Sequence, residues 1–210
     1  MTETVPQVGV EVRRPGGLLL IALVPLAAFM GLAHLTVDGS AGAMTAAQVD
    51  ARALPWMVVA VLWIAPVMLA AFAFRAIGGR MVRLPAAMGI GLSVAYVAAQ
   101  AGVVWIDQAE RLADSSLLPL AILLSLLAWW AVDVAAVLTC LRLAKNSRTA
   151  LVIGVLTAVF LVLEVAIYLP ALIGGQKLVD TVGLPPMVLP VLWAVLGWSL
   201  RRRGSRLHGR

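Results

Sequence analysis

The chain has 210 residues, of which 62% are hydrophobic and 12% are charged, and its formal net charge is +6. A soluble domain has about 45–50% apolar and about 25% charged residues, so this composition excludes an ordinary soluble domain and indicates an integral membrane protein. The basic residues lie in short loops between apolar runs, where they act as orientation signals. We therefore do not expect a nucleic-acid partner.

Six apolar runs predict an all-α, polytopic integral membrane bundle of six transmembrane helices. Each run is long enough to cross about 30 Å of hydrocarbon, and a helix satisfies its own backbone hydrogen bonds in lipid. The expected spans are residues 17–37, 54–74, 84–106, 117–141, 149–173 and 182–200. The expected organisation is a disordered cytoplasmic N-terminal arm (1–15), a six-helix transmembrane domain (16–200) and a basic cytoplasmic tail (201–210).

The distribution of charge predicts the orientation of the bundle. All but three of the 16 Lys and Arg residues lie in the segment 1–15, the loops 75–83 and 142–148, and the tail 201–210. The positive-inside rule then places both termini in the cytoplasm, in a multi-pass protein of the cell (cytoplasmic) membrane. The bias toward Ala, Leu, Val, Gly and Arg resembles that of bacterial proteins. An alternative is that the first run is a cleaved signal peptide, although it exceeds the typical length of about 7–15 apolar residues.

Three alternate connections share the pattern D-x-x-x-L-P, at residues 50–55, 114–119 and 180–185. Their regular spacing of about 65 residues favours three parallel helical-hairpin repeats, an organisation that is common in transporters. The alternative is a local device that arose separately at each helix start. Proline is favoured in the first helical turn, and Asp near a helix N-terminus caps the helix and complements its dipole.

Two acidic residues, Asp133 and Glu164, interrupt apolar runs. A charged side chain at the centre of a membrane helix costs about 3 kcal/mol, so such residues are functional candidates by default. Counting along the spans places Glu164 in one layer of the outer half, and Asp133 roughly 10 Å deeper toward the cytoplasm. The residues expected to share the layer of Glu164 are His34, Gln100, Ser125 and Tyr168.

These positions predict a site that binds a substrate or a proton, with the candidates Glu164, Asp133, Tyr168, Gln100 and His34. A shared layer would surround Glu164 with hydrogen-bond donors from several helices. The alternative is structural, in which each acid pairs with a polar group inside the bundle or in another subunit. Five other tryptophans are expected mostly at span ends, as an interfacial belt: Trp56, Trp63, Trp105, Trp193 and Trp198.

Motifs of soluble catalysis are absent from the sequence. The chain has no G-x-S-x-G, H-E-x-x-H, Walker or Rossmann pattern, so no catalytic residue is predicted. The single cysteine, Cys140, excludes a disulfide framework or a multi-cysteine metal site within one chain. The two histidines are far apart in the sequence, and we expect neither a bound metal nor a cofactor.

Three functions remain open. The first is a small transporter or a transporter membrane subunit, in which Glu164 binds a proton or a cationic substrate. The second is an intramembrane enzyme in which Glu164 or Asp133 acts as a general acid on a lipid or an isoprenoid. The third is an accessory subunit of a membrane complex. The expected partners are the lipid bilayer, a small-molecule or lipid substrate and, in the third case, a membrane protein.

Overall fold

The computed structural model describes residues 13–36, 45–106, 115–173 and 185–206, without some side chains near helix ends, among them those of 33–36, 171–173, 185–187 and 203–206. The regular elements of this part are all helices, which confirms the predicted all-α bundle. They are α2 (Arg13–Ile21), α3 (Leu23–Thr36), α4 (Ala46–Ala51), α5 (Ala53–Ile77), α6 (Arg80–Trp105), α7 (Leu117–Ala144), α8 (Arg148–Ile173) and α9 (Pro185–Arg206).

Five stretches of helix are long and apolar enough to cross a membrane within the described residues: α2 with α3, α5, α6, α7 and α8. The helix α9 corresponds to the sixth predicted span and packs beside α2 and α8. The observed helices exceed some of the predicted spans. The chain is already helical at Arg13, α7 continues to Ala144, and α9 continues to Arg206. The chain is therefore a multi-pass membrane protein.

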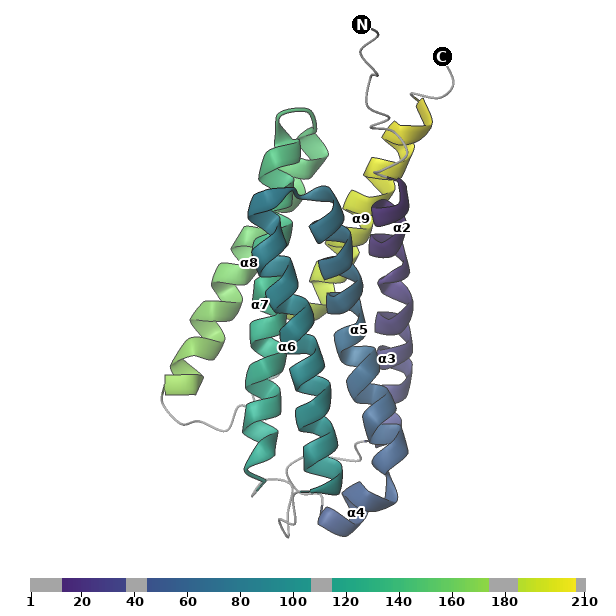
Figure 1. The fold of residues 1–210 in the computed structure, drawn as a ribbon, viewed down its shortest axis with the longest axis vertical. Helices are drawn as coiled ribbons and strands as arrows, with labels where there is room; N and C mark the ends of the chain where they lie inside the picture. The colour runs from purple at the N-terminus through teal and green to yellow at the C-terminus, as the bar shows by residue number, and fades with distance from the viewer. Residues whose placement is uncertain (1–12, 37–44, 107–114, 174–184, 207–210) are drawn as a thin grey trace, which may run out of the picture.

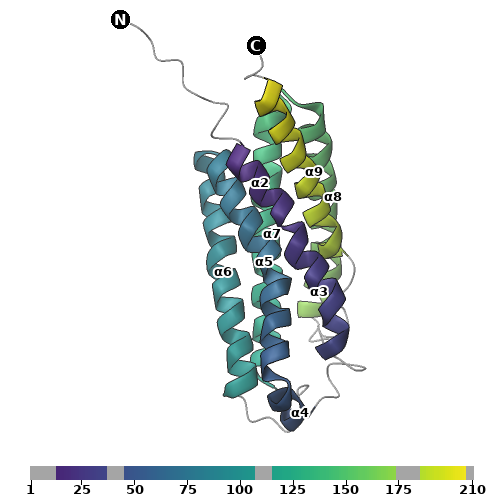
Figure 2. The ribbon, with the colours of Figure 1, turned by 90° about the vertical axis from the view of Figure 1, so that its right-hand side faces the viewer.

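The helices α5 and α7 hold the bundle together (Figures 1 and 2). The helix α5 packs against α2, α3, α6 and α7, and α7 packs against α5, α6 and α8. The helix α8 lies at the edge of the bundle, where it packs against α7 and α9 (Figure 1). Most of its surface is therefore available to lipid.

The start of α2 and the end of α9 lie at the same end of the bundle (Figure 1). A Cβ atom added to Gly16, on α2, would lie 2.9 Å from the carbonyl oxygen of Gly197 and 3.3 Å from Cγ of Arg201, both on α9. The start of the first helix is thus in contact with the last turns of the final helix. This contact agrees with an even number of membrane crossings, because an even number returns the chain to the side on which it began. The cytoplasmic location of this side stays a prediction.

Proline explains the break between α2 and α3. Pro25 has no N–H group, and its ring clashes with the carbonyl of the residue four positions earlier, Ile21, where α2 ends. The chain resumes as α3 at Leu23. Pro66 and Pro190 lie inside α5 and α9, which continue through them.

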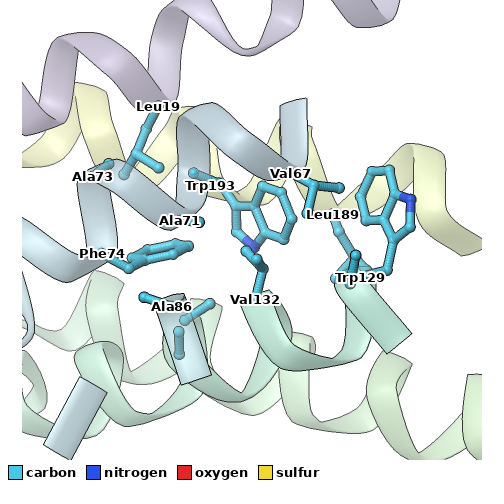
Figure 3. Close-up of a cluster of buried hydrophobic side chains, with 14 of the residues drawn as sticks. Leu19, Val67, Ala71, Ala73, Phe74, Ala86, Trp129, Val132, Leu189 and Trp193 are labelled. Atoms are coloured by element: carbon cyan, nitrogen blue, oxygen red, sulfur yellow. The ribbon is translucent and has the colours of Figure 1, made fainter. Parts of the chain in front are cut away.

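Aromatic rings form a continuous row through the core. Phe29 of α3 contacts Trp63 of α5 with ring centroids 5.0 Å apart, and Trp63 contacts Trp129 of α7 at 5.5 Å. Trp129 stacks on Trp193 of α9 at 5.8 Å, and Trp193 meets Phe74 of α5 edge-on at 5.9 Å (Figure 3). Trp193 is completely buried, so its expected place in an interfacial belt is wrong. Trp105 and Trp198 are exposed.

The shared L-P pattern marks helix starts. Pro55 and Pro119 lie in the first turns of α5 and α7, and α9 begins at Pro185. Capping by aspartate is not seen at α5, where Asp50 belongs to α4 and the N-cap residue Arg52 makes no side-chain cap bond. Asp114 and Asp180 lie outside the described residues. The hairpin repeat stays a prediction.

Candidate functional site

One face of α8 is buried, and half of that face is polar. Apart from the masked side chains at its end, the buried residues of α8 are Ala150, Ile153, Gly154, Thr157, Glu164 and Tyr168. Their spacing of three, four and seven residues places them on a single helical face. The remaining surface of the helix is largely exposed and apolar. The sequence therefore directs the one acid of α8 toward α7 and α9 and away from lipid.

The register between α7 and α8 is set by a close contact. A Cβ atom on Gly154 would lie 2.7 Å from Cβ of Cys140, so these two residues face each other. The helices are antiparallel, because a short turn joins them. Ten residues along each helix from this contact, Trp130 lies at the same level as Glu164.

The same register brings the two acids close together. Asp133 faces Leu161, three residues from Glu164, which is an offset of about 4.5 Å along the helix axis. The two carboxyl groups are within electrostatic range of each other. The predicted separation of roughly 10 Å along the membrane normal is therefore too large. Asp133 and Glu164 therefore lie close together at the junction of α7 and α8.

Both acids are fully buried without a hydrogen-bond partner in the described part of the chain. Asp133 and Glu164 are each 0% exposed, and none of their four carboxyl oxygens accepts a hydrogen bond there. The indole N–H of Trp130 lies near the Glu164 carboxyl group, yet it does not meet the geometry of a hydrogen bond. A buried polar group without a partner costs about 1–3 kcal/mol, and a charged one costs more. Keeping both carboxyl groups buried without partners therefore costs free energy of folding, which is expected where such groups serve the function.

The other polar candidates lie apart from the acids. Gln100 of α6 accepts a hydrogen bond of 2.9 Å from the indole nitrogen of Trp56 on α5. It lies two residues from Gly102, whose added Cβ would meet Leu117 at the start of α7. Trp130 is more than ten residues further along α7, so Gln100 and Glu164 are separated by at least about 15 Å along the bundle. The expected common layer is wrong for Gln100.

Ser125 also does not join the acid pair. Ser125 accepts a hydrogen bond of 2.7 Å from the indole nitrogen of Trp63, on the side of α7 that faces α5. His34 is on α3, and its side chain lies outside the described residues. Tyr168 is the exception, since it is buried one helical turn from Glu164 on the same face of α8.

Within the described residues, no cationic side chain compensates the charge of the two acids. No Lys, Arg or His side chain is among the buried residues of the described ranges. No cluster of three or more metal-binding side chains occurs in those ranges either. A proton or a monovalent cation is the simplest group that neutralises a buried carboxylate.

Trp130 lies three residues before Asp133 in the sequence, but the helix register places it at the level of Glu164. The sequence feature that indicates the pairing of Trp130 with Glu164 is the small residue Gly154, which permits close approach of Cys140. Comparison of the chain with protein-family models, curated proteins and solved structures finds no match.

Proposed function

We propose that this protein is a small transporter, or the membrane subunit of one, that couples transport to proton movement through Asp133 and Glu164. The proposal rests on one observation above all. Two acids on adjacent helices are fully buried, lie about one helical turn apart and have no hydrogen-bond partner among the described residues. Ionisable groups inside membrane helices commonly mark ion pathways and proton relays.

In the proposed mechanism the pair alternates between proton-bound and proton-free states. Two carboxylates in a medium of low dielectric constant repel each other, so loss of a proton from one of them raises the cost of ionising the other. Release of the proton leaves a buried charge at the junction of α7 and α8. A change in the packing of α8, which sits at the edge of the bundle, then opens the site to one side of the membrane. The cytoplasmic side is the one with the basic loops.

The test measures proton flux in a defined membrane. The purified protein is placed in vesicles of phosphatidylethanolamine and phosphatidylglycerol that contain a pH-sensitive dye, and a potassium diffusion potential drives proton entry. We expect wild-type flux above that of empty vesicles, and a loss of at least about tenfold in Glu164→Gln. A panel of small organic cations is then added to find the coupled substrate.

Ser93→Ala is the matched control for this experiment. Ser93 is equally buried, and its hydroxyl donates to the carbonyl oxygen of Gly89 within its own helix α6. Its removal tests a buried polar group that does not belong to the acid pair. Equal flux in Glu164→Gln and wild type would contradict the mechanism. Co-purification of a stoichiometric membrane protein, together with no flux, would instead favour an accessory subunit.

The aromatic row favours a second candidate, acid catalysis on an isoprenoid. Trp129 belongs to this row and lies one turn from Asp133 on the same side of α7. Aromatic faces stabilise carbocations, and a carboxylic acid can protonate an alkene. The test is product analysis after expression with prenyl substrates. A new product that is lost in Asp133→Asn would support the enzyme, and unchanged substrates would exclude it.

A further inference from the structure

We propose that Trp130 is the positioning residue of Glu164. Its indole N–H donates a hydrogen bond to the Glu164 carboxylate once that group releases its proton, so Glu164 is the member of the pair that exchanges protons while Asp133 keeps its own. This inference rests on the proposed function, because it assigns the exchange step to one of the two acids.

Position is the first observation that supports this role. Trp130 and Glu164 lie at the same level in the register set by Cys140 and Gly154. The two side chains are near enough to interact electrostatically. The indole nitrogen of Trp130 is buried and has no hydrogen-bond acceptor among the described residues. A donor without an acceptor therefore lies beside an acceptor without a donor.

The chemistry of the indole makes this contact favour the charged form of Glu164. An indole N–H can only donate, and a hydrogen bond to a charged acceptor is about twice as strong as one between neutral groups. The Trp130 bond to Glu164 therefore strengthens when the proton leaves. Asp133 lies about one helical turn from Trp130 along α7, at the level of the apolar side chain of Leu161. It has no hydrogen-bond donor in the described residues. The two acids thus differ in the support available to their charged forms.

Trp130 also differs from the neighbouring tryptophan. Trp129 is held between Trp63 and Trp193 by ring contacts at 5.5 and 5.8 Å. Trp130 belongs to none of the ring contacts of the described residues and is only half-buried. Its ring can turn without disturbing the aromatic row. This freedom suits a side chain that makes its hydrogen bond in one protonation state only.

Other titratable groups near Glu164 are few. On α7 they are Asp133 and Cys140, and on α8 itself the nearest is Tyr168. The stretch of α9 between residues 188 and 200 carries no titratable side chain. A spectroscopic change that accompanies proton release at Glu164 can therefore be assigned with a small set of variants.

The experiment follows both groups in the full-length protein in lipid nanodiscs. Infrared difference spectra between low and high pH record the carbonyl band of a protonated carboxyl group, which Glu164→Gln and Asp133→Asn assign. Ultraviolet resonance Raman spectra record the indole N–H band that reports hydrogen bonding. We expect the loss of the Glu164 carboxyl band to coincide with a shift of one indole band. That shift should vanish in Trp130→Phe and Glu164→Gln, and persist in Asp133→Asn.

Trp129→Phe is the matched control, because it removes an equally unpartnered indole N–H from the adjacent position. The indole shift should persist in this variant. Persistence of the shift in Trp130→Phe would overturn the proposal, as would proton release from Asp133 in place of Glu164. If Trp130→Phe does not fold, the comparison of Glu164→Gln with Asp133→Asn decides the same point, since only Glu164→Gln should remove the shift.

Flux measurements separate this inference from the proposed function. Trp130→Phe should slow proton flux about tenfold, as expected for loss of a hydrogen bond to a charged group, and Trp130→Gln, which retains an N–H donor, should restore part of it. If the loss of the Glu164 carboxyl band coincides with the indole shift but no proton flux is found, the result would contradict transport and leave the role of Trp130 intact. If flux is normal and depends on Glu164 but no indole band shifts, the positioning role of Trp130 would be rejected and the proposed function would stand.

Discussion

Cys140 of α7 packs directly against Gly154 of α8, so closely that a Cβ atom on residue 154 would lie 2.7 Å from Cβ of Cys140. Cβ atoms are attached to the backbone, so neither can move aside without moving its helix. This single contact sets the register of the two helices. Through that register it also determines which residue of α7 lies opposite Glu164.

Gly154→Ala should separate α7 from α8. The added methyl group overpacks the contact, and we expect a loss of about 1–3 kcal/mol in the free energy of unfolding together with reduced proton flux. Thermal unfolding in detergent checks the first effect. Gly91→Ala is the control, because an added Cβ there has no neighbour within 4 Å. Adding Cys140→Gly should restore stability to Gly154→Ala; equal stability of Gly154→Ala and Gly91→Ala would contradict the contact.

Glu164→Met should stabilise the protein and abolish its proton flux. Met has a similar length and no polar atom that needs a partner, so the substitution removes two buried oxygens that have no donor in the described part. We expect a gain of about 1–3 kcal/mol in the free energy of unfolding. Thermal melting and flux are measured on the same preparation. A marked loss of stability would mean that the carboxyl group is satisfied and structural.

Gln100→Ala should weaken the bundle without slowing proton movement. Gln100 pairs with Trp56 and lies far from the acid pair, so its loss removes one part-buried hydrogen bond of about 1 kcal/mol. A double-mutant cycle with Trp56→Phe measures that coupling by thermal unfolding. Flux should remain within about twofold of wild type, a limit set by the small energy of a neutral hydrogen bond. A tenfold loss of flux would mean that Gln100 belongs to the proton-binding site after all.

Gly79→Ala should destabilise the turn between α5 and α6. Gly79 has φ of +76°, a conformation that L residues rarely adopt, and a Cβ there would overlap the guanidinium of Arg142. That guanidinium donates a 3.3 Å hydrogen bond to the carbonyl oxygen of Ile77 and so ties α7 to the end of α5. We expect a loss of about 1–3 kcal/mol by thermal unfolding. Gly17→Ala, with no neighbour within 4 Å, should change stability little.

Arg142→Ala tests the other half of this contact. The hydrogen bond to Ile77 is exposed to solvent, so we expect a loss of no more than about 1 kcal/mol. In the double variant with Gly79→Ala the guanidinium overlap disappears, and part of the loss caused by Gly79→Ala should be recovered. Strictly additive losses, measured by the same unfolding assay, would show that only the backbone conformation of Gly79 matters.

The sequence alone determined the class of protein, the helices and the positions of two acids within apolar helices. Apolar run length and the scarcity of charge predict spans directly, because a helix in lipid has few alternatives. Asp133 and Glu164 stand out for the same reason, since acids inside such runs are costly. These are properties of single segments, and no knowledge of neighbouring helices is needed to find them.

Only the tertiary structure decided which side chains meet. Helix ends cannot be read to within a turn, and α7 runs three residues past its predicted end, which shifts every level counted from that end. The face that a helix turns to each neighbour depends on packing, so Gln100 pairs with Trp56 while Trp193 enters the core. The contact of Cys140 with Gly154 then brings the two acids close together, with Trp130 beside Glu164.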